Sequence, residues 1–333
     1  MKELKDKKVI VTGGAGFIGS HLVDRLLELG NQVIVIDDFS LGKKENLAHQ
    51  EYNPNLKIYD KDICDKDILD LFEGVNIVFH VAAVPRVQYS IKYPKKTNRA
   101  NIYGTLNILE ACKKAGVKRF VYSASSSAYG DQDKLPLIET MNPNPMSPYA
   151  LQKLVGEYYC KLYYLIHGIE TISLRYFNVY GPRQDPDGGY ACLIPKSINL
   201  VLEEKSPVIY GDGEQTRDFT FVKDVVESNI LAAVTENKKA FGEVFNIGNG
   251  NNLSVNFVVK SIIGDKDIKP IYSDPVIEPR DTLADISKAK KILSWQPKYT
   301  FEQGLKETIE WFRIKGFYDK KEAIKKGFKY FRL

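Results

Sequence analysis

Apolar residues in the first half of the chain alternate between short runs and helical spacing. A β-branched run at 9–11 suits a buried strand, and Ile18, Leu22, Leu26 and Leu29 then repeat along one face of a helix. Further runs that predict strands lie at 33–36, 56–59, 76–81, 119–123 and 171–175. Helical patterns at about 98–115 and 148–167 separate the later runs. This alternation predicts an α/β fold with a doubly wound parallel sheet of the Rossmann type.

A glycine-rich turn joins the first predicted strand to the first helix. Gly13 permits the tight turn, Gly16 lets backbone amides approach a pyrophosphate, and Gly19 allows the helix to pack closely on the strand. The free N–H groups at the start of the helix favour an anion. Asp37 ends the second strand, 18 residues after Gly19, near the spacing expected for a carboxylate that binds ribose. These features together predict a dinucleotide site.

Small and polar residues follow the next predicted strands. Asp62 and Ile63 come after the third strand, Ala82 and Ala83 after the fourth, and a hydroxyl cluster begins at Ser123 in the fifth. Ligands of doubly wound sheets bind at the carboxyl ends of the strands, so these residues are candidates for cofactor contacts. Ordinary core packing is the alternative for the two alanines.

Tyr149 and Lys153 lie four residues apart in the predicted helix at 148–167, and so project from one face. A free tyrosine, with a pKa near 10, is a poor base at neutral pH. A nearby lysine ammonium favours the phenolate and lowers that pKa, so the pair can exchange a proton with a substrate hydroxyl.

The second half of the chain is less regular and predicts a smaller, interleaved substrate lobe. We divide the chain into a dinucleotide domain at 1–175, a mainly substrate-binding lobe at 176–312 and a basic tail at 313–333. Arg217-Asp218 and Arg280-Asp281 each place an arginine beside a carboxylate in an expected loop. Arginine forks suit a diphosphate, although such dipeptides more often form surface ion pairs.

Composition narrows the function classes. Neither the four cysteines nor the four histidines cluster at metal-ligand spacing, which predicts reduced thiols and no metal site. No signal segment or membrane span is evident, and we expect a soluble cytoplasmic protein with no membrane partner. The tail alone carries a net charge of +6, so the rest of the chain is −1, and Phe317, Ile324, Phe328 and Phe331 are interleaved with the tail lysines. A docked amphipathic helix explains the tail better than nucleic-acid binding does.

The motifs together resemble the extended short-chain dehydrogenase/reductase superfamily, and within it the nucleotide-sugar 4-epimerases. The resemblance covers about residues 7 to 312. The motifs that carry it are Thr-Gly-Gly-Ala-Gly-Phe-Ile-Gly at 12–19, Asp37, Asp62-Ile63, Asn101, the serine run at 123–127, Tyr149 with Lys153, Arg-Tyr-Phe-Asn at 175–178, and Arg217-Asp218. It implies bound NAD, a UDP-sugar substrate and a homodimer. It also implies that Tyr149 takes the proton of the sugar 4-hydroxyl as hydride passes from C4 to NAD.

Position matching to the family assigns further roles. Tyr149, Lys153 and Ser125 are the implied catalytic residues, and Asp37 is expected to favour NAD over NADP. The implied cofactor contacts are Gly13, Gly16, Phe17, Ile18, Gly19, Asp37, Asp38, Asp62, Ile63, Ala82, Ala83, Asn101, Ser123, Tyr149, Lys153, Tyr176 and Phe177. The implied substrate contacts are Ser125, Ser126, Tyr149, Asn178, Ala191, Arg217, Arg280 and Thr282.

The resemblance leaves the substrate and the reaction partly open. Relatives that dehydrate or decarboxylate nucleotide sugars typically carry an acid where this chain has Ser126 and Ser127, which favours simple epimerisation. The loop at 183–191 looks like that of epimerases that accept UDP-GlcNAc, and Thr282 matches the position that admits an N-acetyl group. A UDP-glucuronate 4-epimerase, a dehydratase or decarboxylase, and a non-catalytic NAD-binding scaffold are the alternatives.

Overall fold

The computed structural model describes residues 4–187, 192–276 and 278–319, and its central element is a seven-stranded sheet. The strands are all parallel, in the order β11-β6-β5-β4-β1-β2-β3. Their bounds are β1 Lys8–Thr12, β2 Gln32–Asp37, β3 Leu56–Asp60, β4 Ile77–His80, β5 Arg119–Ser125, β6 Glu170–Tyr176 and β11 Glu243–Ile247. The predicted doubly wound fold is therefore confirmed.

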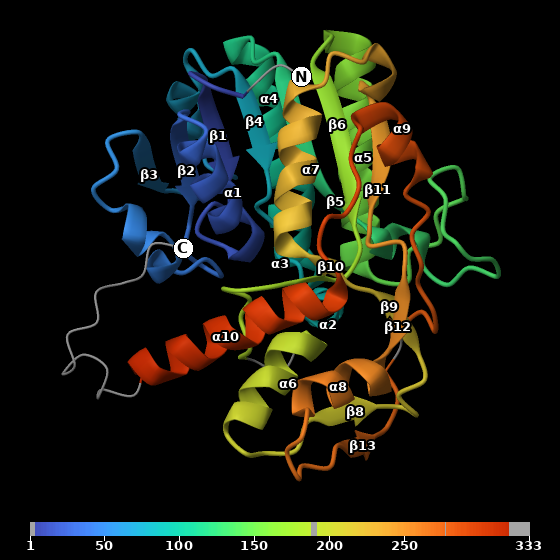
Figure 1. The fold of residues 1–333 in the computed structure, drawn as a ribbon. Helices are drawn as coiled ribbons and strands as arrows, with labels where there is room; N and C mark the ends of the chain where they lie inside the picture. The colour runs from blue at the N-terminus through green and yellow to red at the C-terminus, as the bar shows by residue number, and fades with distance from the viewer. Residues whose placement is uncertain (1–3, 188–191, 277, 320–333) are drawn as a thin grey trace.

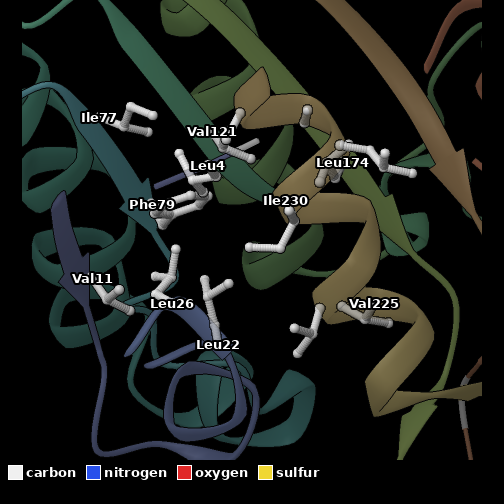
Figure 2. Packing of buried hydrophobic residues seen from close by; sticks show 14 of the residues in the cluster. Leu4, Val11, Leu22, Leu26, Ile77, Phe79, Val121, Leu174, Val225 and Ile230 are labelled. Atoms are coloured by element: carbon white, nitrogen blue, oxygen red, sulfur yellow. The ribbon is translucent and has the colours of Figure 1, made fainter. Parts of the chain in front are cut away.

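Helices cover both faces of this sheet. They are α1 Phe17–Glu28, α4 Thr105–Ala115, α5 Pro148–His167, α7 Val222–Val234 and α9 Ser287–Leu293. The short helices α2 Val87–Lys92 and α3 Pro94–Asn98 pack on α5. The 3-10 helices η1 Lys44–Gln50, η2 Lys66–Phe72, η4 Ser126–Tyr129 and η5 Lys238–Ala240 lie in the connections between elements. Alternate residues of each strand face opposite layers. Val9 and Val11 pack on the α1 and α7 side, whereas Ile10 packs against α4 and α5. Figure 2 shows Val11 in the first of these layers, with Leu22 of α1 and Ile230 of α7.

A smaller lobe lies beyond the carboxyl ends of the strands (Figure 1). It contains the helices α6 Leu193–Leu202 and α8 Val255–Ile263, the start of α10 Phe301–Asp319, and the short strands β7 Val179–Tyr180, β8 Val208–Tyr210, β9 Thr216–Asp218, β10 Thr220–Phe221, β12 Asn252–Ser254 and β13 Ile271–Ser273. Most of these elements contribute to a separate hydrophobic cluster that includes Ile198, Phe219 and Val258. Two later segments leave the lobe: residues 222–234 pack on the main sheet as α7, and residues 243–247 join it as β11.

The structure corrects two local predictions, and a third lies largely outside the residues that it describes. The helix expected at about 98–115 is divided: α3 ends at Asn98, a π-helical turn, η3, spans Arg99–Gly104, and α4 follows. Arg217-Asp218 is not in a loop, because β9 pairs antiparallel with β12. The predicted tail helix is outside the described residues from 320 onward, and α10 carries the chain as far as Asp319. None of the helices in the described part of the chain has the length and apolar character needed to cross a membrane.

Candidate active site

The glycine turn forms a close-fitting cradle between β1, β4 and α1. Gly13 has a φ of +67°, and a Cβ there would lie 2.7 Å from the Cα of Ala82. A Cβ on Gly19 would lie 2.1 Å from the carbonyl oxygen of Gly13. The first turn of α1, which begins at Phe17 and Ile18, has no acidic residue, and no side chain caps it at Gly16. Its N–H groups are therefore available to an anion.

Asp37 anchors this cradle from the end of β2. Its carboxylate accepts hydrogen bonds from the backbone N–H of Ala15 and from that of Phe39, both at 2.9 Å. Burial raises the pKa of Asp37, and the two N–H groups oppose that change. The neighbouring Asp38 instead accepts hydrogen bonds from Ser40. Asp37 thus presents its carboxylate at the carboxyl edge of the sheet, beside the glycine turn.

The end of β3 carries two further predicted residues to this edge. Asp62 follows β3, accepts a hydrogen bond from the Cys64 N–H at 2.8 Å and pairs with Arg99. Ile63 packs so closely on the π-helical turn that a Cβ on Gly104 would lie 2.5 Å from its side chain. Both residues therefore connect the end of β3 to the segment that contains Asn101.

Asn101 lies in the π-helical turn and clamps the loop after β4. Its amide oxygen accepts from the Val84 N–H at 2.8 Å, and its Nδ2 donates to the Val84 carbonyl at 3.2 Å. Nδ2 also donates to Gln152 Oε1 on α5 at 2.8 Å. The loop that carries Ala82 and Ala83 is thereby fixed to the helix that carries Tyr149 and Lys153. π-Helical turns within helices frequently mark functional sites.

Ser125, Tyr149 and Lys153 come together where β5 ends and α5 begins. Burial raises the pKa of the Tyr149 phenol to about 12, while a hydrogen bond with Ser125 acts in the opposite direction. The Lys153 side chain is 3% exposed and donates from Nζ to the Ser123 carbonyl at 2.8 Å. Burial lowers the pKa of Lys153 to about 8, whereas Cys160 and Glu157 oppose that change. The site thus contains a phenol, a hydroxyl and a lysine able to exchange protons.

Other members of the serine run and the end of β6 support this site. The Ser125 hydroxyl is also hydrogen-bonded by Ser127, through N at 3.2 Å and Oγ at 2.9 Å, and Ser126 begins η4 between them. Ser123 Oγ lies 3.1 Å from the hydroxyl of Tyr176. Phe177 has no exposed surface and packs with Tyr129, Leu137 and Ala284. In this structure Phe177 therefore belongs to the core behind the site.

Residues predicted to hold a diphosphate meet in the smaller lobe. Asn178 has a φ of +22° and donates to the Asp218 carbonyl at 3.3 Å. Arg217 is 8% exposed and pairs with Glu278 at 2.9 Å. Thr282 is 9% exposed, and its hydroxyl accepts from the Asp218 N–H at 3.4 Å.

Arg280 and Ala191 are placed differently. The Arg280 guanidinium is 59% exposed and pairs with Asp212 at 3.0 Å on the surface. It would have to leave Asp212 to reach a ligand beside Arg217. Ala191 lies outside the described residues.

Several residues that organise the site were not predicted. The Asp218 carboxylate accepts from the N–H groups of Asn249, Gly250 and Ala284 at 2.6 to 3.1 Å, and so joins three segments of the lobe. Burial raises the pKa of Asp218 to about 6, and these N–H groups oppose that change. Asp185 joins the two parts of the molecule, pairing with Lys43 at 2.9 Å and Arg86 at 3.1 Å. No local sequence pattern signals these contacts, because the partners are far apart in the chain.

The residues present fit a dinucleotide. Side chains at Gly13 and Gly19 would fill the cradle, the start of α1 offers unpaired N–H groups, and Asp37 supplies an acceptor for ribose hydroxyls at the same edge. Along the same edge, Tyr149 and Lys153 lie beside the end of β5. The arrangement can bind a dinucleotide with one end beside an acid–base pair.

Comparison with known proteins agrees with this arrangement. Residues 9–248 match the model of the NAD dependent epimerase/dehydratase family. A putative UDP-glucose 4-epimerase of Methanocaldococcus jannaschii is 41% identical over 312 residues, covering 92% of this chain and 98% of that protein.

Solved structures extend the comparison. The UDP-N-acetylglucosamine 4-epimerase of Methanobrevibacter ruminantium, in complex with UDP-N-acetylmuramic acid, superimposes with a TM-score of 0.89 at 41% identity and covers 93% of this chain and 99% of that one. The UDP-glucuronic acid 4-epimerase of Bacillus cereus, in complex with UDP-glucuronic acid and NAD, gives a TM-score of 0.86 at 35% identity, covering 92% and 99%.

Proposed function

The chain belongs to the NAD-dependent epimerase/dehydratase family, and on that basis we propose that it is a UDP-hexose 4-epimerase with tightly bound NAD. The substrates are UDP-GlcNAc and UDP-GalNAc, UDP-glucose and UDP-galactose, or both pairs. The observation that carries the proposal is the placement of Ser125, Tyr149 and Lys153 at the sheet edge that also presents Gly13 and Asp37. Identification of the products formed from UDP-glucose and from UDP-GlcNAc tests it.

The chain's own residues supply the proton chemistry. The glycine cradle and Asp37 would hold NAD, which when bound would supply reversible hydride transfer at C4 of the sugar. Tyr149 takes the proton of the 4-hydroxyl and later gives it back, and Ser125 holds that hydroxyl beside it. Lys153 stabilises the phenolate form of Tyr149 by its charge. The 4-keto sugar turns over between the two transfers.

The proposed cofactor contacts follow the cradle and the strand ends. They are Gly13, Gly16, Phe17, Ile18, Gly19, Asp37, Asp38, Asp62, Ile63, Ala82, Ala83, Asn101, Ser123, Tyr149, Lys153, Tyr176 and Phe177. For Phe177 the role requires its buried ring to become accessible, because it has no exposed surface in this structure.

Replacing Asp37 with asparagine is expected to weaken NAD binding by about tenfold to a hundredfold, because a charged acceptor for ribose and for the Ala15 N–H is lost. The NAD that stays with the purified protein is measured by enzymatic cycling after heat release. Asp60→Asn is the matched control, since Asp60 is the exposed register partner of Asp37. Equal NAD retention in both variants would contradict the assignment.

The smaller lobe is proposed to hold the UDP-sugar. Residues 1–175 then bind mainly NAD and residues 176–312 mainly the substrate, although 222–234 and 243–247 pack in the NAD-binding part. In this proposal Asn178 and Arg217, which lie next to each other through Asp218, hold the diphosphate, and Arg280 assists once it leaves Asp212. Ser125, Ser126, Tyr149, Ala191 and Thr282 complete the proposed substrate contacts.

Thr282 is the proposed gate for the N-acetyl group. Thr282→Tyr should lower kcat/KM for UDP-GlcNAc by about tenfold or more through steric exclusion, while UDP-glucose still turns over. Thr282→Ser, which keeps the hydroxyl that accepts from the Asp218 N–H, is the control. Both sugars are assayed in parallel by NMR. Unchanged UDP-GlcNAc turnover in the tyrosine variant would show that another residue forms the gate.

A UDP-glucuronate 4-epimerase and a dehydratase or decarboxylase are the alternative enzymes. Ser126 and Ser127 begin η4 in the serine run and offer no acidic group for proton chemistry away from C4. A dehydratase or decarboxylase releases water or CO₂ from the sugar, whereas an epimerase conserves mass, so the mass of the product separates these activities.

We also propose that the protein acts as a cytoplasmic homodimer. The outer face of α5 exposes Leu151, Tyr158, Leu162 and Leu165, spaced so that they share one helix face, each with between 47% and 64% of its surface exposed. The four cysteines are all free, which suits a reducing compartment. Leu162→Lys combined with Leu165→Lys is expected to give monomers in analytical ultracentrifugation, unlike Lys161→Glu on the same helix. A double variant that stays dimeric would exclude this face as the interface.

A further inference from the structure

The charged end of Lys153 lies over an aromatic ring. Its Nζ is 4.9 Å from the centre of the Tyr122 ring on β5 and donates a hydrogen bond to the Ser123 carbonyl at 2.8 Å. Both side chains are buried, Lys153 at 3% and Tyr122 at 0% exposure. A buried ammonium loses its hydration, so contact with the negative face of a ring is worth more there than at an exposed site.

The position of the Tyr122 ring is fixed from several sides. His80, its register partner on β4, stacks on it with ring centres 5.8 Å apart and planes 20° from parallel. On the α5 side, a Cβ at Gly156 would lie 2.1 Å from the Tyr122 hydroxyl oxygen. The Tyr122 hydroxyl reaches the Lys153 carbonyl at 3.4 Å. The ring therefore sets how α5, and with it Lys153, sits above the sheet.

His80 is held neutral beneath this contact. The Thr105 hydroxyl donates to the Asn101 carbonyl at 2.7 Å, so it must accept from His80 Nε2, 2.9 Å away. His80 Nδ1 is then left to accept from Thr12 Oγ1 at 2.8 Å. Burial, followed by the charge of Lys153, lowers the pKa of His80 to about 3. A neutral imidazole does not compete with Lys153 as a cation beside the Tyr122 ring.

The other charged and titratable groups near Lys153 come from α5 and β6. Glu157 is already paired with Arg175 of β6 at 2.6 Å, so the Arg175 guanidinium offsets much of the negative charge of Glu157. Burial raises the pKa of the Cys160 thiol, so Cys160 is neutral. Tyr149 precedes Lys153 by one helical turn. The face of the Tyr122 ring therefore contacts the Lys153 ammonium directly, and the ring itself carries no net charge.

We propose that Tyr122 is a positioning residue for Lys153. The aromatic face of Tyr122 holds the lysine ammonium in place and keeps it charged beside Tyr149. The catalytic part of this inference rests on the proposed epimerase function, but the effect on Lys153 does not. Loss of the aromatic face removes a favourable contact of the protonated form only. The Lys153 ammonium then gives up its proton at a lower pH.

The test compares Tyr122→Leu with Tyr122→Phe in the intact protein as purified. Lysine labelled with ¹³C at Cε reports the protonation of each side chain by NMR, and the Lys153 signal is identified by its loss in Lys153→Met. Tyr122→Leu should lower the midpoint of the Lys153 titration by about one pH unit, and Tyr122→Phe should restore the wild-type midpoint. Equal midpoints in all three proteins would overturn the proposal, as would equal shifts in both variants, which would assign the effect to the hydroxyl.

Fluorinated phenylalanines at position 122 give the same test without a change of shape, should Tyr122→Leu fail to fold. Each added fluorine weakens the negative ring face, so the midpoint should fall stepwise, and a flat series would refute the role of the face. The pH at which kcat/KM falls on the alkaline side should shift in the same direction and by a similar amount as the midpoint of the Lys153 titration. Absence of turnover in the wild type would refute the proposed function, while the NMR titration would still decide the role of Tyr122.

Discussion

Tyr149→Phe is expected to lower kcat by about 10²- to 10⁴-fold, because the phenol that exchanges the proton of the 4-hydroxyl is lost. The phenylalanine ring keeps the shape of the side chain, and the bond between the Tyr149 backbone N–H and Ser90 Oγ at 3.1 Å is unaffected. The protein should therefore fold and retain NAD. Progress curves with UDP-glucose and UDP-GlcNAc measure the loss.

Tyr52→Phe is the control for this prediction, since Tyr52 is 92% exposed and precedes the amino end of β3, whereas the site lies at the carboxyl ends of the strands. It should leave kcat unchanged. A Tyr149→Phe enzyme within a factor of a few of wild type would show that another group exchanges the proton, and the assignment of α5 as the catalytic helix would fall with it.

Lys153→Met is expected to lower kcat at pH 7 by about 10²-fold or more, because Tyr149 loses the cation that stabilises its phenolate. Burial already raises the pKa of Tyr149 to about 12, and removing a positive charge raises the pKa of Tyr149 further. The remaining activity should therefore increase with pH over a range in which wild-type activity declines. A pH profile of kcat from 6 to 10 measures both effects.

Lys161→Met, at an exposed position on the same helix, is the matched control and should keep the wild-type profile. If Lys153→Met lowered kcat equally at every pH, the lysine would act by shape or packing rather than by its charge. The proposed role in the proton exchange would then be wrong.

Local patterns predicted the layers of the fold because a strand that is buried on both faces needs apolar residues at successive positions. Val9 and Val11 face one layer of helices and Ile10 faces the other, which is why a continuous apolar run marks a central parallel strand. The glycine turn and the Tyr149–Lys153 spacing are also local, and the structure places both at the same sheet edge. Such features need no knowledge of distant partners.

Long-range pairing accounts for what sequence reasoning missed. The strand β9 is three residues long and exists because β12 pairs with it from 36 positions away. The π-helical turn around Asn101 is stabilised by Val84 and Gln152, neither of which is a local partner. In the sequence, His80 is simply the last residue of a mostly apolar predicted strand. The fold shows that its imidazole is hydrogen-bonded to both Thr12 and Thr105.

Side-chain pairing also decided the outcome for individual site residues. Arg217 and Arg280 look alike in sequence, each followed by an aspartate, yet Arg217 is 8% exposed whereas the Arg280 side chain is 59% exposed and bound to Asp212. The spacing of Asp37 predicts a contact with ribose, and the structure adds that its carboxylate holds the Ala15 N–H of the glycine turn. Composition cannot distinguish these cases, because the competing partners come from other segments.

The measurement that tests the central claim most directly is product identification without added cofactor. The purified protein is incubated separately with UDP-glucose and with UDP-GlcNAc, and the sugars are identified by NMR and mass spectrometry. The proposed function predicts conversion of at least one of them to its galacto epimer with no change in mass. If neither sugar reacts even after NAD is added, the protein is not a UDP-hexose 4-epimerase, and UDP-glucuronate becomes the next substrate to test.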